Sequence, residues 1–170
     1  IEASLTGHLV FSTLHTNSAP ETVTRLLDMG LDPLNFSDAI IGIVAQRLVR
    51  TLCNDCKEPY TPEAGEIERL ANAYGKELFP ELGIDLAKAK LCRAKGCEKC
   101  GGTGYRGRTG IHEVLVGTRE MKNLIVTRPG PDQVRILATQ QGMRTLLQDG
   151  VAKVFMGQTD LDQVRGITVV

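Results

Sequence analysis

Two C-x-x-C motifs constrain this chain more than any other feature of its sequence. They are Cys53-Asn54-Asp55-Cys56 and Cys97-Glu98-Lys99-Cys100. Two thiolates spaced in this way on a tight turn can bind one ion together, and four thiolates complete the tetrahedral shell of a closed structural zinc site. Closing the loop over the insert between the motifs costs roughly 3 kcal/mol in the unfolded chain, whereas zinc binding contributes on the order of 10 kcal/mol. We therefore predict a bound zinc ion whose ligands are Cys53, Cys56, Cys97 and Cys100.

Disulfide bonds or a redox C-x-x-C are the alternative interpretations of these cysteines. Two paired motifs carry more information than one, and nothing in the sequence indicates secretion, so zinc is favoured. Cys92 is the remaining cysteine; it lies too far from Cys97 to share that turn, and we interpret it as a thiol outside the site. A closed four-cysteine site has no open coordination position, so the metal is expected to stabilise the fold and not to catalyse.

Size and charge exclude several classes of protein. With 170 residues and 42% hydrophobic content, the chain is long enough for one core with a small additional module. Lys and Arg number 20, as do Asp and Glu, which argues against nucleic-acid binding through bulk positive charge. No apolar run is long enough to span a bilayer and no signal peptide opens the sequence, so a cytoplasmic setting is expected. Residues 1–5 lack a starting Met and resemble the end of a helix, so we expect a fragment.

The N-terminal segment predicts a strand followed by a helix. Residues 8–14 are mostly apolar and β-favouring, as in a strand buried on both faces of an α/β sheet. Ser18 and Glu21 have capping-box spacing for a helix that ends at Gly30. Because open α/β sheets bind ligands at the carboxyl ends of their strands, the candidate functional residues here are His8, Ser12, Thr13 and His15. The alternative is that each is an ordinary core or turn residue.

Apolar periodicity predicts further helices. Residues 32–48 are apolar on nearly all sides and predict a central helix. Arg47 and Arg50 lie at its end; such an arginine pairs with a carboxylate or a phosphate, and the carboxylate is the simpler choice. An amphipathic surface helix is predicted in the insert. The C-terminal third predicts a helical cluster, with helices over about 131–142, 146–157 and 159–166.

Glycines dominate residues 101–110, and three of them match G-x-G-x-x-G. The dinucleotide fingerprint needs a strand before this motif and a helix after it. Here a C-x-x-C pair precedes it and a strand-like segment, residues 111–116, follows. We therefore reject the match and expect these glycines to let the backbone pass close to the metal site, with Arg106 and Arg108 displayed beside it. His112 is interpreted as a strand residue.

Three stretches of the chain closely resemble the secretion ATPases of bacterial type II secretion and type IV pilus assembly. They are TGHLVFSTLHTN at residues 6–17, AQRLVRTLC at 45–53 and GCEKCGGTGYRGRTG at 96–110. They follow the order found in that family, and the resemblance covers essentially the whole chain.

This resemblance implies a RecA-like ATPase that uses ATP and Mg and assembles as a homo-hexamer at the cytoplasmic face of the inner membrane. There it would work on a pilus or pseudopilus base through inner-membrane platform proteins. The first stretch corresponds to the His box of the family, which implies that His8 and His15 lie near the nucleotide, and Arg47 sits where an arginine can approach it. The cysteines correspond to the four-cysteine metal-binding element of the family.

The implied fold class is α/β, with three parts along the chain. Residues 1–52 would be the C-terminal part of a RecA-like ATPase core, residues 53–110 a four-cysteine zinc module, and residues 111–170 a strand with the C-terminal helical cluster. No G-x-x-x-x-G-K-[ST] occurs in the sequence, and the resemblance places Walker A and Walker B before Ile1. These residues alone are therefore expected neither to bind ATP tightly nor to hydrolyse it.

A zinc-stapled binding module without enzymatic activity is the alternative function. Residues 97–104 are similar to the C-x-x-C-x-G-x-G unit of DnaJ-type chaperones. Those proteins repeat the unit several times, whereas this chain has one full copy, which disfavours a chaperone. A zinc-ribbon nucleic-acid binder is disfavoured by the balanced charge and the 4% aromatic content.

Overall fold

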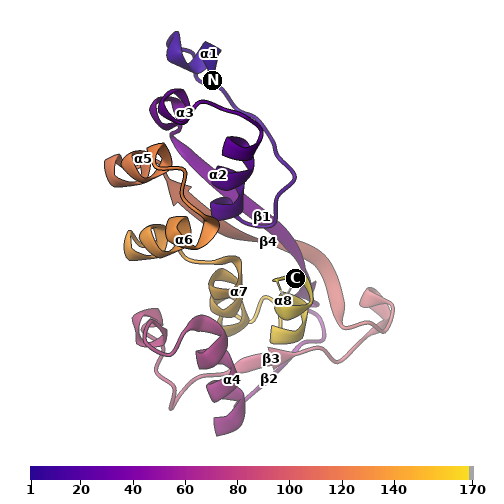
Figure 1. Ribbon diagram of the computed structural model, residues 1–170. Coiled ribbons are helices and arrows are strands. Elements are labelled where there is room, and N and C mark those ends of the chain that lie inside the picture. The colour runs from indigo at the N-terminus through magenta and orange to yellow at the C-terminus, as the bar shows by residue number, and fades with distance from the viewer. Residues whose placement is uncertain (169–170) are drawn as a thin grey trace. The chain divides into compact units, whose positions relative to one another are not determined.

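The computed structural model describes residues 1–168, which form two compact units (Figure 1). The first consists of residues 1–45 and 113–144, and the second of residues 46–112 and the chain from Thr145 onward. Two long strands, β1 (Gly42–Leu52) and β4 (Tyr105–Val116), pair with each other and contribute residues to both units. They run in opposite directions, because the N–H of Gly117 donates to the Ile41 carbonyl and the N–H of Cys53 to the Gly104 carbonyl.

The first unit is mainly helical. Its helices are α1 (Glu2–Leu5), α2 (Ala19–Asp28), α3 (Pro33–Ala39), α5 (Arg119–Val126) and α6 (Pro131–Gln140). Three of them begin at a side-chain cap. The Ser18 hydroxyl accepts from the N–H of Glu21 at 3.3 Å, Asp32 accepts from the N–H of Asn35 at 2.9 Å, and the Thr118 hydroxyl accepts from the N–H of Met121 at 3.1 Å. The buried core of this unit is formed by Ala19, Val23, Leu27, Phe36, Leu115, Met121, Ile125, Val134, Ala138 and Met143.

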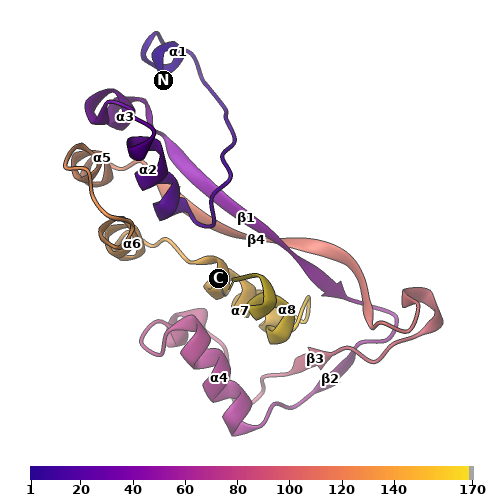
Figure 2. The ribbon, with the colours of Figure 1, turned by 45° about the vertical axis from the view of Figure 1, so that its right-hand side comes forward.

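The second unit combines short strands with helices (Figure 2). The strands β2 (Glu58–Tyr60) and β3 (Leu91–Arg93) pair antiparallel, with Pro59 opposite Cys92. The helices are α4 (Ala64–Tyr74), α7 (Leu146–Phe155) and α8 (Leu161–Thr168), with short 3-10 helices at Phe79–Leu82 and Glu98–Cys100. Its core is formed by Val49, Leu70, Tyr74, Phe79, Leu91, Ile111, Leu146, Val151, Val154 and Val164.

The strand predicted over residues 8–14 is wrong. These residues form neither helix nor strand, and Leu9, Val10 and Phe11 are 69%, 47% and 88% exposed. A strand needs a neighbour for its backbone hydrogen bonds. Among the described residues β1 pairs with β4 and β2 with β3, so no strand lies beside this segment.

The central helix predicted over residues 32–48 is also wrong. The helix α3 ends at Ala39, and β1 begins at Gly42. An apolar run without polar interruptions cannot distinguish a buried helix from a strand by periodicity alone, and the β-branched residues in this run favour the strand. Side chains then alternate between the faces of β1: Ile43 packs on the first core, whereas Val44 is 63% exposed.

Other predicted elements are confirmed. The helix in the insert is α4, the C-terminal helices are α6, α7 and α8, and residues 111–116 form the last part of β4 with His112 in the strand. The helix α5 was not predicted. Helices and strands are thus mixed, which is consistent with the α/β class. Within residues 1–168, every helix is too short or too polar to cross a membrane.

Candidate functional site

The four cysteines of the C-x-x-C pairs lie in two tight turns. Cys53 follows the last residue of β1, and the N–H groups of Cys56 and Lys57 both donate to its carbonyl, at 3.2 and 2.8 Å. In the second pair, Cys97 precedes a 3-10 helix that ends at Cys100, whose N–H donates to the Cys97 carbonyl at 3.2 Å. Each turn therefore brings its two thiols to the same side of the backbone.

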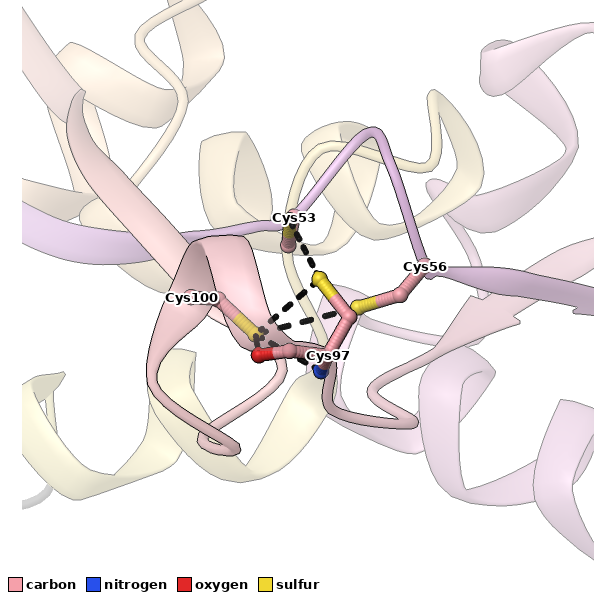
Figure 3. Close-up of side chains that lie close together, drawn as sticks. All are labelled: Cys53, Cys56, Cys97 and Cys100. Atoms are coloured by element: carbon pink, nitrogen blue, oxygen red, sulfur yellow. Dashed lines mark hydrogen bonds between the residues drawn. The ribbon is translucent and has the colours of Figure 1, made fainter.

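The sulfur atoms of these cysteines point toward one another (Figure 3). The Sγ atoms of Cys53 and Cys97 are 4.0 Å apart, those of Cys56 and Cys100 are 3.9 Å apart, and all four lie within 4.8 Å of one another. A tetrahedral ion with zinc-to-sulfur bonds of about 2.3 Å separates its sulfurs by about 3.8 Å. Disulfide sulfurs lie about 2.05 Å apart, so these are free thiols whose arrangement can hold one metal ion.

Backbone N–H groups around Cys100 favour the thiolate that a metal requires. The N–H groups of Cys97 and Gly104 donate to the Cys100 Sγ at 3.1 and 3.2 Å. The hydrogen bond from Cys97 is the main reason that the pKa of Cys100 is lowered to about 6. Burial raises the pKa of Cys56 to about 12 in the absence of metal, so a bound cation would have to displace its proton.

Charged side chains surround the cysteines. Lys99 donates to Asp55 at 2.6 Å, and Arg106 lies 3.6 Å from the same carboxylate. The hydrogen bond from Lys99 lowers the pKa of Asp55 and raises that of Lys99. Lys95 donates to Glu58 at 2.6 Å. These ion pairs are largely exposed and contribute little stability by themselves. Their cations would partly compensate the negative charge of four thiolates around a metal ion.

Of this charged shell, the sequence predicted Arg106 but not Asp55, Lys99, Glu58 or Lys95. Asp55 and Lys99 occupy the variable positions of the two C-x-x-C motifs, and their opposite charges were the available signal that the two turns face each other. The expectation that the glycines of residues 101–110 let the backbone pass close to the cysteines is confirmed at Gly104, whose N–H donates to the Cys100 Sγ at 3.2 Å and whose added Cβ would lie 2.5 Å from the Cβ of Ala94. At Gly101, Gly102 and Gly107 an added Cβ would meet nothing within 4 Å.

The predicted histidines lie in the first unit, on separate segments. His8 is exposed in the turn after α1, where its Nδ1 lies 3.1 Å from the Ala3 carbonyl and 3.2 Å from the Thr6 hydroxyl. His15 is exposed on the segment that leads into α2. Ser12 and Thr13 are exposed between them. The structure therefore places His8 within a local turn and His15 on the segment before α2.

The remaining candidates lie in the second unit. Arg47 is half-buried on β1, and its guanidinium is 3.4 Å from the Gln46 carbonyl. Cys92 is on β3, opposite Pro59, and is absent from the cluster of four sulfurs. Arg108 is exposed on β4.

Comparison with known proteins adds information that the geometry does not contain. Residues 1–166 match the model of the family described as "Type II/IV secretion system protein". The chain is 46% identical over 170 residues to the type II secretion system ATPase E of Vibrio cholerae. It is 42% identical over 168 residues to the type IV pilus assembly ATPase PilB of Thermus thermophilus. Each alignment covers 99% of this chain, but only 31% of the first relative and 18% of the second.

Proposed function

This chain belongs to the type II/IV secretion system protein family, and we propose that it forms the C-terminal part of a hexameric ATPase that powers type II protein secretion or type IV pilus assembly. The observation that carries this proposal is the family match over residues 1–166, together with relatives that are named as ATPases. Because the chain spans less than a third of those relatives, binding and hydrolysis of ATP with Mg are proposed for the whole protein.

In this proposal the segments of the chain have different tasks. Residues 1–52 complete a RecA-like nucleotide-binding core, residues 53–110 form the metal-binding element, and residues 111–170 form the strand and C-terminal helices. His15, exposed before α2, would contact the nucleotide phosphates, because a histidine N–H can donate to a phosphate oxygen. His8 would support the same site, and Arg47 would approach the nucleotide.

The four cysteines would hold zinc as a structural ion. Zinc suits a set of four thiolates. Three of the sulfur separations, 3.7, 3.9 and 4.0 Å, fit its bond lengths, and all four sulfurs lie within 4.8 Å of one another. Bound there, it would link the turn after β1 to the turn before β4. We further propose that the protein works in the cytoplasm at the inner membrane, with platform proteins of the secretion or pilus machinery as partners and without nucleic acid.

Steady-state ATP hydrolysis by the purified full-length protein tests this proposal. We expect turnover by the full-length protein and none by the 170-residue chain alone. We expect His15→Ala to lower kcat by about 100- to 1000-fold, the size of a lost hydrogen bond to developing charge on the reacting group. His112→Ala is the matched control, because it removes another exposed histidine.

Two results would count against the proposal. One is ATP turnover by the isolated chain that His15→Ala abolishes, since the phosphate-binding segments would then be unnecessary. The other is a loss of kcat in His15→Ala that is matched by an equal loss of thermal stability, since His15 would then be structural.

The proposal also predicts what the residues encoded before Ile1 contain. They should include a strand followed by G-x-x-x-x-G-K-[ST].

A further inference from the structure

Glu113 is a buried acidic residue to which the proposed function assigns no role. It lies on β4 with 4% of its surface exposed, and its Oε1 accepts a hydrogen bond from the N–H of Ala19 at 2.8 Å. Ala19 is the first residue of α2. The bond therefore uses one of the N–H groups that a helix leaves unpaired at its N-terminus, where an acidic side chain is also favoured by the helix dipole.

Two hydrogen bonds around the start of α2 are local in sequence. The hydroxyls of Thr16 and Thr22 lie 2.6 Å apart, and the N–H of Asn17 donates to the Glu21 carboxylate at 2.9 Å. These bonds shape the segment that follows His15, but both partners of each bond belong to the same segment. The bond from Ala19 to Glu113 instead joins positions 94 residues apart, and so attaches the segment to the strand β4.

We propose that Glu113 is a positioning residue for His15. By holding the first N–H of α2 against β4, it sets where the segment before the helix can place its imidazole. This inference rests on the proposed function, in which His15 contacts the nucleotide. A short segment with hydrogen bonds of its own connects His15 to Ala19, so a shift of the start of α2 also moves His15. Misplacement of a contacting group by about 1 Å can cost a factor of about 100 in rate.

The test uses the full-length protein and compares two substitutions of Glu113. Glu113→Ala removes the acceptor, and we expect kcat for ATP hydrolysis to fall about 10- to 100-fold with little change in KM. Glu113→Gln retains an acceptor oxygen of the same reach and should recover most of the loss, because the amide can still accept from Ala19. Glu77→Gln is the control, since Glu77 is exposed. Hydrogen exchange should show that the Ala19 amide loses protection in Glu113→Ala only.

A double-mutant cycle with His15→Ala separates positioning from a general loss of structure. If Glu113 acts through His15, Glu113→Ala should lower kcat no further once His15 is absent. Full additivity of the two effects would overturn the inference, and so would loss of Ala19 protection with unchanged kcat. If Glu113→Ala fails to fold, the cycle is run with Glu113→Gln instead. The inference would then be contradicted if Glu113→Gln lowers kcat by the same factor in the His15→Ala background as in the wild-type background. The His15→Ala variant alone tests the proposed function, so the two failures are distinguishable.

Discussion

Gly104 shows how closely the backbone passes the metal site. Its φ is +79°, and a Cβ at this position would lie 2.5 Å from the Cβ of Ala94. Its N–H donates to the Cys100 Sγ at 3.2 Å. The residue is therefore constrained in two ways, since a side chain would be strained by the left-handed backbone and would also push the N–H away from the sulfur.

Substitution of Gly104 by Ala is expected to separate these two costs. Gly102 is the matched control, because its φ is +76° but nothing lies within 4 Å of its Cβ position. Gly102→Ala should cost about 1 kcal/mol for the left-handed backbone alone, and Gly104→Ala should cost several kcal/mol in total because the clash is added. Urea unfolding of the zinc-loaded protein measures both. Equal losses in the two variants would contradict the close approach at Gly104.

Tyr105 supplies a prediction about pH. Its hydroxyl donates to Asp160, and burial followed by this hydrogen bond raises the pKa of the phenol to about 12. Because the pKa is higher in the folded state, the protonated phenol stabilises the fold fully below pH about 10, and this contribution is lost as the pH rises toward 12. Tyr105→Phe should therefore cost about 1 kcal/mol near neutral pH. In urea unfolding this cost should shrink above pH about 10, and a constant difference would contradict the prediction.

At the scale of elements, the sequence predicted an element correctly where several local signals agree and incorrectly where composition was the main signal. Helix α2 was predictable because a cap, an apolar stripe and a following glycine agree at its position. Helix α4 has no side-chain cap, but Pro62 before it, its apolar stripe and Gly75 after it agree. The helix α3 and the strand β1 were not separated, because residues 40–45 are apolar throughout and only their β-branched composition favours a strand. The segment 8–14 has a strand-like composition without a neighbouring strand among the described residues, which no local pattern can reveal.

Gln148 joins two helices of the second unit. Its Nε2 donates to the Tyr74 carbonyl at 2.7 Å, at the end of α4, while its Oε1 accepts from the N–H of Thr145 at 2.8 Å, at the start of α7. Gln148→Ala removes the hydrogen bonds to the Tyr74 carbonyl and from the Thr145 N–H and should cost about 1 to 3 kcal/mol in urea unfolding. Gln140→Ala, at the exposed end of α6, should change stability by less than about 0.5 kcal/mol. Similar losses of unfolding free energy in the two variants would mean that the hydrogen bonds of Gln148 between α4 and α7 contribute nothing specific to stability.

At the scale of the whole molecule, residues 1–168 contain two cores and one cluster of four cysteines that could hold a metal ion. The cysteines all belong to the second unit, whereas the core of the first unit is built from α2, α3, α5, α6 and β4. The sequence indicated that these four cysteines lie together because their spacing is local within each pair. It did not reveal the two units, because both β1 and β4 contribute to each of them and the boundary therefore falls inside continuous strands.

Removal of the metal is accordingly expected to affect the two units unequally. Metal analysis should give one zinc per chain, and chelation or Cys97→Ser should destabilise the second unit by several kcal/mol, because the binding free energy of a structural zinc is also folding free energy. Cys92→Ser is the control, since Cys92 lies outside the cluster of four sulfurs. Hydrogen exchange should then show lost protection in β2 and β3 while α5 and α6 retain theirs, since the first core contains none of the ligands. Unchanged exchange in β2 and β3 after complete zinc removal would exclude a structural role for the four cysteines.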